Sequence, residues 1–107
     1  VATNCSNELG RRAAARIDVP FQAIATAAEA GFYKPRPEPY RAILAALGTA
    51  SERTLFVAGS AADVPGARGV GMPVYWHNRM RLDPVDATRP DFMEKSLLPL
   101  IDVILDV

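Results

Sequence analysis

The stretch 55–71 constrains the fold of this chain more than any other part of the sequence. It opens as an apolar run suited to a buried strand, breaks at Gly59 and Ser60, and continues with Asp63 and Pro65 in the pattern of a helix start. This order places a carboxylate at the carboxyl end of a strand, the edge where parallel sheets bind ligands. Asp63 would serve equally as the helix N-cap, so the residues alone leave both roles open.

Apolar periodicity predicts strands and helices that alternate along the chain. Strands are expected over 1–3, 54–58, 74–76 and 91–93, and helices over 8–16, 38–47, 62–70 and 97–105. The segment 21–30 is ambiguous, because its alanines favour a helix whereas 21–26 also suits a short strand. Alternation of this kind produces parallel pairing through crossover connections. We therefore expect a three-layer α/β fold, with a parallel sheet and helices on both of its faces.

The segment 31–39 is expected to be largely irregular. Three prolines within five positions remove backbone donors and push the residues before them toward extended geometry. Lys34 is one of these residues, and taken alone it is typical of a solvent-exposed lysine. The helix that follows is expected to end at Gly48, a residue type that favours the left-handed C-cap.

Composition limits the classes of protein to which the chain can belong. Its 107 residues carry 12 basic and 12 acidic side chains, which indicates one small domain of zero net charge and gives no reason to expect nucleic-acid binding. One cysteine and one histidine exclude an internal disulfide and the usual zinc sites. The single cysteine fits a reducing compartment, so we expect a cytoplasmic protein. The C-terminal apolar run carries Asp102 and is too short to cross a membrane.

Three segments, taken in order, resemble the haloacid dehalogenase (HAD) superfamily of hydrolases. They are the strand end Val-Ala-Thr-Asn at 1–4, the segment 31–40 with its Lys-Pro-Arg-Pro-Glu-Pro-Tyr run from Lys34, and the Ala-Gly-Ser-Ala-Ala-Asp-Val-Pro-Gly-Ala run at 58–67, which contains Asp63. The Trp-His-Asn-Arg run from Trp76 is similar to the family's 2-haloacid dehalogenase branch. The resemblance identifies residues 1–107 as the C-terminal part of a HAD-like, Rossmann-type core domain, from its second to its fourth motif. It also implies a strand, and no helix, over 21–26.

The resemblance implies roles for five side chains. In this family an aspartate at the end of the first strand attacks phosphorus or carbon, and water then cleaves the ester that forms. Thr3 is expected to hydrogen-bond the group that gains charge, Lys34 to pair with the nucleophilic carboxylate, and Asp63 to position the lysine, the water or a metal. Asn4 and Ser60 are the expected contacts to a small-molecule substrate or to water.

The sequence departs from the family pattern in the opening motif, because no aspartate occurs before Asp18. The nucleophile and the cap domain that usually precedes the second motif are therefore not among these residues. A start at Val1 that reads as the inside of a strand agrees with this, so we expect a piece of a longer protein that is inactive alone. The resemblance places the family's first strand between strands 1–3 and 54–58. The sheet is then incomplete, and its bare edges should recruit the N-terminal half, a second copy of the chain, or each other.

A second departure concerns metal binding. Magnesium-dependent phosphatases of the family carry an acidic residue near the start of the fourth motif, typically Gly-Asp followed by a later Asp, where this chain has Gly59 and Ser60. A hard cation prefers anionic oxygen ligands, so the sequence favours the branch that hydrolyses the carbon–halogen bond of a 2-haloacid without a cofactor. Two alternatives stay open. One is a Mg²⁺-dependent phosphatase in which Asp63 contacts the metal, and the other is a non-catalytic, degenerate HAD-like module kept for binding or assembly.

Overall fold

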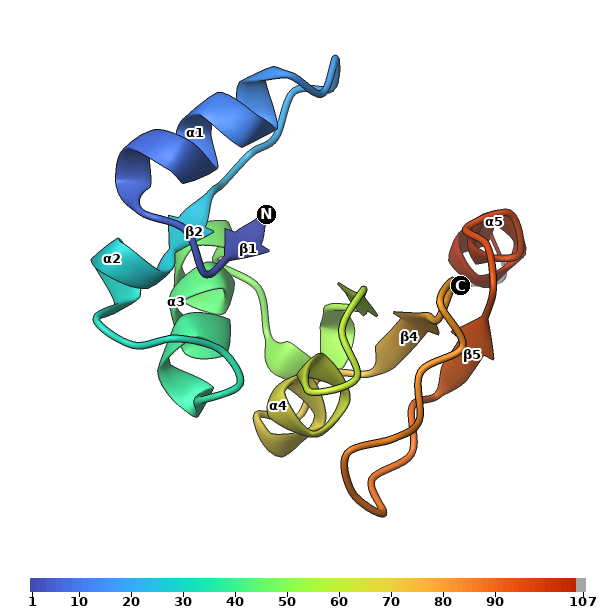
Figure 1. Cartoon of the computed structure of the whole chain (residues 1–107). Helices are drawn as coiled ribbons and strands as arrows, with labels where there is room; N and C mark the ends of the chain where they lie inside the picture. The colour runs from blue at the N-terminus through green and yellow to red at the C-terminus, as the bar shows by residue number, and fades with distance from the viewer. Residues whose placement is uncertain (106–107) are drawn as a thin grey trace.

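The computed structural model describes residues 1–105, in which all the strand pairs are parallel (Figure 1). The first sheet contains β1 (Ala2–Thr3) and β2 (Ala25–Thr26). The second contains β3 (Phe56–Ala58), β4 (Val74–His77) and β5 (Phe92–Glu94), in that order. The α/β class with parallel pairing is therefore confirmed.

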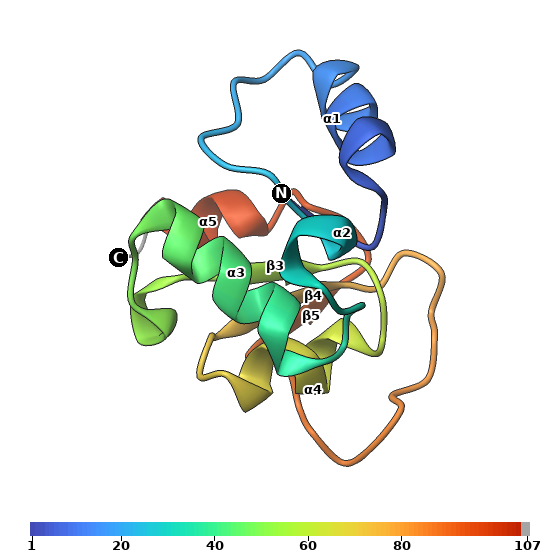
Figure 2. The same ribbon diagram turned by 90° about the vertical axis from the view of Figure 1, so that its left-hand side faces the viewer.

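Helices join these strands in the alternation that the sequence predicts. They are α1 (Asn7–Ala15), α2 (Ala27–Ala30), α3 (Pro37–Leu47), α4 (Asp63–Gly69) and α5 (Leu100–Leu105), with a 3-10 turn, η1 (Ser51–Arg53), after α3. The helices predicted over 8–16, 38–47 and 62–70 are confirmed to within one residue at each end. Figure 2 shows α3 lying between α2 and α4, in agreement with its packing against both.

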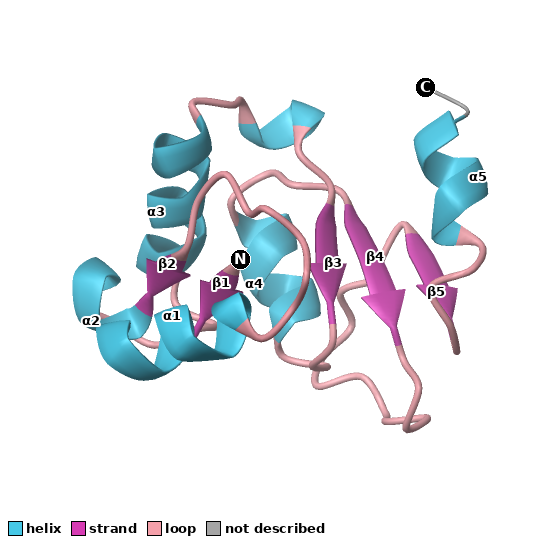
Figure 3. Ribbon diagram, turned by 90° about the horizontal axis from the view of Figure 1, so that it is seen from above, coloured by secondary structure: helices cyan, strands magenta, loops and turns pink. Residues whose placement is uncertain are grey.

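The parallel sheet is divided between β1 and β3. Figure 3 shows the strands across the molecule in the order β2, β1, β3, β4, β5, with their arrows directed to the same side of the view. Hydrogen-bonded pairing joins β1 to β2 and joins β3 to β4 and β5. The expectation of an incomplete sheet is confirmed, because the strands form two separate sheets. β1 does not pair directly with β3.

The segment 21–30 is shared between a strand and a helix. Only Ala25–Thr26 pairs with β1, so the strand predicted over 21–26 is wrong for its first four residues. The hydroxyl of Thr26 accepts a hydrogen bond from the Glu29 N–H at 3.3 Å and thereby caps α2. Gly31, with φ of +80°, ends α2 in the left-handed conformation. Capping at Thr26 thus ends the strand at the predicted residue, whereas residues 21–24 form no strand pair with β1.

The main hydrophobic core lies between α4 and the three-stranded sheet, and Tyr40 of α3 packs into it. The ring of Tyr40 meets Phe56 edge-to-face, with 5.2 Å between ring centroids. Tyr40, Val74 and Trp76 are each no more than 1% exposed. The core is completed by Ala58, Ala61, Val64, Ala67 and Met72. This packing fixes the position of α4 and therefore of its first residue, Asp63.

Helix α5 forms close to the predicted position but leaves its apolar side chains in solvent. Leu98 just before it and Leu105 at its end are each 75% exposed, and Ile101 is 56% exposed. Helices were expected on both faces of the sheet, but this short helix does not bury its apolar side chains against either face. Among residues 1–105, no helix has the length and apolar character that a membrane span requires.

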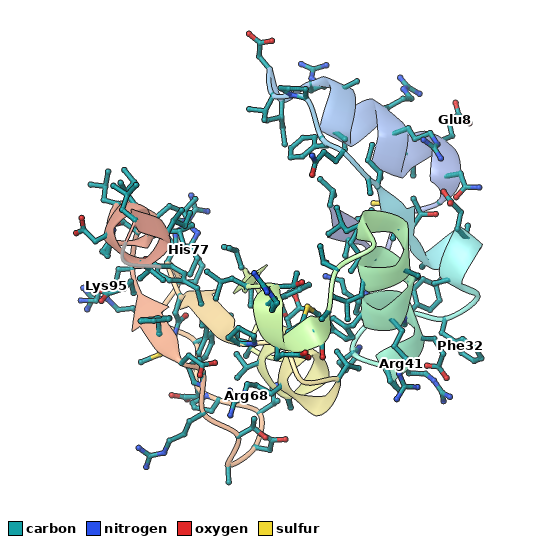
Figure 4. All side chains as sticks on the ribbon, turned by 180° about the vertical axis from the view of Figure 1, so that it is seen from behind. Glu8, Phe32, Arg41, Arg68, His77 and Lys95 are labelled. Atoms are coloured by element: carbon teal, nitrogen blue, oxygen red, sulfur yellow. The ribbon has the colours of Figure 1, made fainter. Side chains whose placement is uncertain are left out.

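Asp91 is expected to stabilise the connection into β5. Its carboxylate accepts two hydrogen bonds from Arg68 on α4, at 3.0 and 2.9 Å, and one from the Val74 N–H at 2.8 Å (Figure 4 shows Arg68 beside this loop). The ion pair is partly exposed and contributes little, so most of the effect comes from the backbone donor. Asp91→Ala should lower the free energy of unfolding by about 1–2 kcal/mol in urea denaturation. The exposed Asp83→Ala is the control, and equal losses in the two variants would contradict this role.

Candidate active site

The loop between α2 and α3 carries Lys34 to the carboxyl end of β1. Gly31 turns the chain out of α2, the Lys34–Pro35 peptide bond is cis, and Pro37 starts α3. Asn4, directly after β1, holds the main chain of Lys34. Its side-chain oxygen accepts from the Lys34 N–H at 2.7 Å, and its amide donates to the Lys34 carbonyl at 3.3 Å. Asn4 therefore positions the main chain of the lysine, and its predicted contact to substrate or water stays a prediction.

Lys34 forms an ion pair with Asp63. Lys34 Nζ lies 3.2 Å from Asp63 Oδ2, with side-chain exposures of 16% and 8%. The ammonium also lies 5.7 Å from the centroid of the Phe56 ring. Lys34 lies in the α2–α3 loop beside the end of β1, and Asp63 starts α4 after β3. The ion pair therefore joins the carboxyl ends of β1 and β3. The structure thus brings together two of the three residues predicted to be catalytic.

Asp63 is not the N-cap of α4. The N-cap is Ala62, whose side chain forms no capping hydrogen bond, and Asp63 is the first residue of the helix. Both carboxylate oxygens point to other partners: Oδ2 meets Lys34, and Oδ1 accepts a hydrogen bond from the Tyr40 hydroxyl at 2.6 Å. The N-cap interpretation is therefore wrong. A buried carboxylate held by a cation and a hydroxyl is poised for a charge-positioning role.

Tyr40 is the member of this network that sequence reasoning missed. The sequence placed it on the helix over 38–47 and in the run that starts at Lys34, without a role in the site. Its fully buried side chain donates its hydroxyl to Asp63. Gly66 on α4 makes room for it, since a Cβ at that position would lie 2.3 Å from the Tyr40 hydroxyl oxygen. The available signal was general: a buried tyrosine hydroxyl needs a hydrogen-bond partner, and Asp63 was the carboxylate predicted at the carboxyl end of the strand over 54–58.

The other two predicted residues lie near this network without contacting the ion pair. The Thr3 hydroxyl, at the end of β1, donates to the Cys5 sulfur at 3.2 Å. The exposed Ser60, after β3, accepts a hydrogen bond from the Ala62 N–H at 3.2 Å. Ser60 lines the same cavity as Lys34 and Asp63, whereas Thr3 does not line it. Their roles toward substrate therefore stay predictions.

A cavity of about 750 Å³ lies between β1 and β3. Ser60, Lys34 and Asp63 supply the polar side chains at its carboxyl-end rim. Its apolar wall is contributed by Val1, Ala2, Phe21, Ile43, Leu47, Leu55, Phe56, Val57 and Met72. The arrangement offers a space with a mostly apolar wall and with one cation and one carboxylate at its rim.

Burial raises the pKa of the Tyr40 hydroxyl far above its usual value, and its hydrogen bond to Asp63 adds to the effect. The unfolded phenol ionises near pH 10, while the folded one stays protonated above that pH. Stability that Tyr40 contributes below pH 10 is therefore lost as the pH rises further, by about 1.4 kcal/mol per unit.

Tyr40→Phe is expected to flatten this alkaline loss. Urea unfolding measured between pH 8 and pH 11 should show a smaller decline for Tyr40→Phe than for the unaltered chain, although the variant starts about 1.5–3 kcal/mol less stable. The control is Tyr33→Phe, because Tyr33 is 67% exposed. If the decline were the same in all three proteins, the burial of a neutral Tyr40 would be refuted.

The residues present do not fit a magnesium ion. Within the described residues 1–105, no group of three histidine, cysteine, aspartate or glutamate side chains is placed to hold a metal. Asp63 is the one acidic residue lining the cavity, and both its oxygens are engaged by Lys34 and Tyr40. A hard cation needs several free oxygen ligands, and the described residues that line this cavity do not supply them.

Comparison with known proteins identifies the family. The model of the haloacid dehalogenase-like hydrolases matches residues 1–71, about two-thirds of the chain. The chain belongs to the haloacid dehalogenase-like hydrolases. The matched residues include every predicted site residue of this HAD-like chain: Thr3, Asn4, Lys34, Ser60 and Asp63.

Solved structures show the same fold. The L-2-haloacid dehalogenase RSc1362 is 20% identical with a TM-score of 0.88, over 97% of this chain and 47% of that one. A 2-haloacid dehalogenase from Pseudomonas syringae pv. Tomato DC3000 is 24% identical with a TM-score of 0.69, over 78% of this chain and 36% of that one. A HAD phosphatase from Thermococcus onnurineus is 26% identical with a TM-score of 0.70, over 78% of this chain and 39% of that one.

The HAD-like chain thus spans less than half the length of these solved structures. At 20–24% identity, the dehalogenase structures establish the fold of the chain. A search of curated proteins found no match.

Proposed function

We propose that this HAD-like chain supplies the Lys34–Asp63 part of an active site that hydrolyses the carbon–halogen bond of a 2-haloacid. The observation that carries the proposal is the buried ion pair at the rim of the cavity, 3.2 Å between Lys34 Nζ and Asp63 Oδ2. An ammonium has three N–H donors and Asp63 occupies one, so the lysine retains donors for a second carboxylate. Paired in this way, that second carboxylate stays ionised and nucleophilic.

The proposed reaction has two steps. A carboxylate oxygen attacks the carbon that bears the halogen, the carbon–halogen bond breaks, and halide leaves with the bonding electrons, so that an ester forms. Water then attacks the ester carbonyl, which regenerates the carboxylate and releases a 2-hydroxy acid and one proton. Asp63 is held by Tyr40 and Lys34, so we assign the nucleophile to an acidic residue outside these 107 residues. The 107-residue chain alone is then expected to be inactive.

The engagement of Asp63 favours the dehalogenase over the phosphatase alternative. Both of its oxygens accept hydrogen bonds from protein donors, which leaves this carboxylate poorly suited to a metal. The likeness to the Thermococcus onnurineus HAD phosphatase, 26% identical, keeps a Mg²⁺-dependent phosphatase as the second candidate.

Two assays on the complete protein separate the candidates. Halide release from 2-chloropropionate and phosphate release from p-nitrophenyl phosphate are measured with and without EDTA. The proposal predicts halide release that EDTA does not change. Phosphate release that EDTA abolishes, without halide release, would establish the phosphatase, and no activity toward either compound would support a binding module.

A further inference from the structure

The indole N–H of Trp76 is a buried hydrogen-bond donor without a partner. Trp76 lies in β4, pairs in register with Ala58 of β3, and is 1% exposed. Within the described residues 1–105, its Nε1 is the one buried side-chain nitrogen or oxygen that forms no hydrogen bond. A buried indole N–H usually finds an acceptor, because its lost hydration is otherwise not offset. An acceptor that comes from outside the protein would therefore be bound favourably at Trp76.

Trp76 lines a cavity of about 520 Å³ at the loop that joins β4 to β5 (residues 78–91, orange in Figure 1). The volume is many times that of one water molecule and lies in the range of small-ligand sites. The cavity shares no lining residue with the one between β1 and β3. The residues that line it besides Trp76 are Pro84, Asp86, Ala87, Thr88, Arg89, Pro90 and Met93.

The loop is held at both ends and not in the middle. The Asn78 side chain donates to the Leu82 carbonyl at 2.9 Å and accepts from the Leu82 N–H at 2.8 Å. At the other end, Asp91 accepts hydrogen bonds from Arg68 and from the Val74 N–H. Within the described part of the chain, residues 83–90 hydrogen-bond only to one another. The middle of the loop can therefore shift by the small amount that opens Trp76 Nε1 to a ligand.

The polar groups at the cavity specify the charge of that ligand. Among residues 1–105, the guanidinium of Arg89 forms no ion pair. The acidic lining residue, Asp86, accepts a hydrogen bond from the Thr88 N–H at 2.8 Å and is thereby tied to its own loop. The indole of Trp76 and the guanidinium of Arg89 are donors only, so together they favour an anionic acceptor such as a carboxylate.

We propose that this cavity binds a small apolar carboxylate. Its oxygens accept hydrogen bonds from Trp76 Nε1 and from the Arg89 guanidinium, and its apolar part packs against Pro84, Pro90 and Met93. The site is separate from the proposed reaction, because neither Lys34 nor Asp63 lines it. Each can therefore fail while the other holds.

The test follows the Trp76 indole N–H of the complete protein by NMR. The probe is 4-methylpentanoate, which combines a carboxylate with a branched apolar tail. Two matched compounds separate these parts: 4-methylpentanamide keeps the tail and an acceptor without the charge, and acetate keeps the charge without the tail. The indole signal is assigned by its loss in Trp76→Phe, or from its connectivity to the backbone of β4 if that variant does not fold.

We expect 4-methylpentanoate to move the indole proton signal downfield and to saturate it, with a Kd of roughly 1 mM. The amide and acetate should bind about tenfold more weakly, because each lacks one of the two interactions. Arg89→Met should weaken binding of 4-methylpentanoate about tenfold. Arg89 is exposed, so this variant should fold.

Two control variants fix the location of the site. Arg12→Met removes an exposed arginine of α1 and should leave the affinity unchanged. Lys34→Met should also leave it unchanged, whereas a loss of the indole response in this variant would place the probe in the other cavity and overturn the proposal.

Three further results would overturn it. They are an indole signal that does not move at probe concentrations up to about twenty times the expected Kd, equal affinity for the carboxylate and the amide, and equal losses in Arg89→Met and Arg12→Met. An indole N–H that contacts a long-lived water and responds to no probe would assign the cavity to ordered water.

Discussion

Lys34→Met is expected to lower the rate of halide release by the complete protein about a thousandfold. The ammonium of Lys34 is the cation at the rim of the cavity, 3.2 Å from Asp63. Two hydrogen bonds from the Asn4 side chain hold the main chain of Lys34. Without it, the second carboxylate loses the charge that keeps it ionised, and the charge that develops in the transition state is no longer offset. Methionine keeps the apolar stem as far as the Cε position and removes the ammonium, including its contact with the Phe56 ring.

Two further variants identify the cause of that loss. Lys34→Arg keeps the charge but replaces a compact ammonium by a planar fork, so it should restore only part of the rate. Lys95→Met removes an exposed lysine and should leave the rate unchanged. A Lys34→Met protein that releases halide at the rate of the Lys95→Met control would exclude Lys34 from the chemistry.

Gly66→Ala is expected to lower the free energy of unfolding by about 3 kcal/mol. The added Cβ would lie 2.3 Å from the Tyr40 hydroxyl oxygen and 2.6 Å from two carbons of its ring. Tyr40 is fully buried between α3 and α4, so the helices must separate or the hydroxyl must leave Asp63. Either change also disturbs the carboxylate that holds Lys34.

Gly69→Ala is the matched control in the same helix, because a Cβ at Gly69 would meet no atom within 4 Å. That variant should be neutral or more stable by up to about 1 kcal/mol, the usual preference of a helix for alanine. In the Tyr40→Phe background, Gly66→Ala should lower the free energy of unfolding by less. The contact of the new Cβ with the hydroxyl oxygen is then gone, while its contacts with the ring carbons remain. Equal effects of Gly66→Ala and Gly69→Ala on urea unfolding would refute the close approach of α4 to Tyr40.

Local patterns in the sequence were sufficient to predict most helices and the parallel pairing. The apolar stripe that ends at Gly48 predicted α3, whose C-cap is indeed Gly48 with φ of +67°. The start of β2 could not be predicted, because it depends on which residues meet β1, and only Ala25 and Thr26 pair with Ala2 and Thr3. The exposure of α5 is likewise a property of tertiary packing, which its own periodicity does not report.

The candidate site was predicted in part. Lys34 and Asp63 were expected together, and the structure places them in contact. The two roles that were missed, Asn4 as support for the Lys34 main chain and Tyr40 as donor to Asp63, depend on contacts between residues 30 and 23 positions apart in the chain. No local pattern reports such contacts. The order of strands and helices, by contrast, predicts that the carboxyl ends of parallel strands lie at the same edge of the sheet.

The most direct test of the account is a double-mutant cycle on halide release by the complete protein. Lys34→Met, Asp63→Asn and the double variant are compared with the unaltered protein, with unfolding measured to confirm that each is folded. If Asp63 acts by positioning Lys34, the double variant should be no slower than Lys34→Met within about threefold. Losses that multiply, so that the double variant falls by the product of the two single effects, would show that the two residues act independently and would contradict the account.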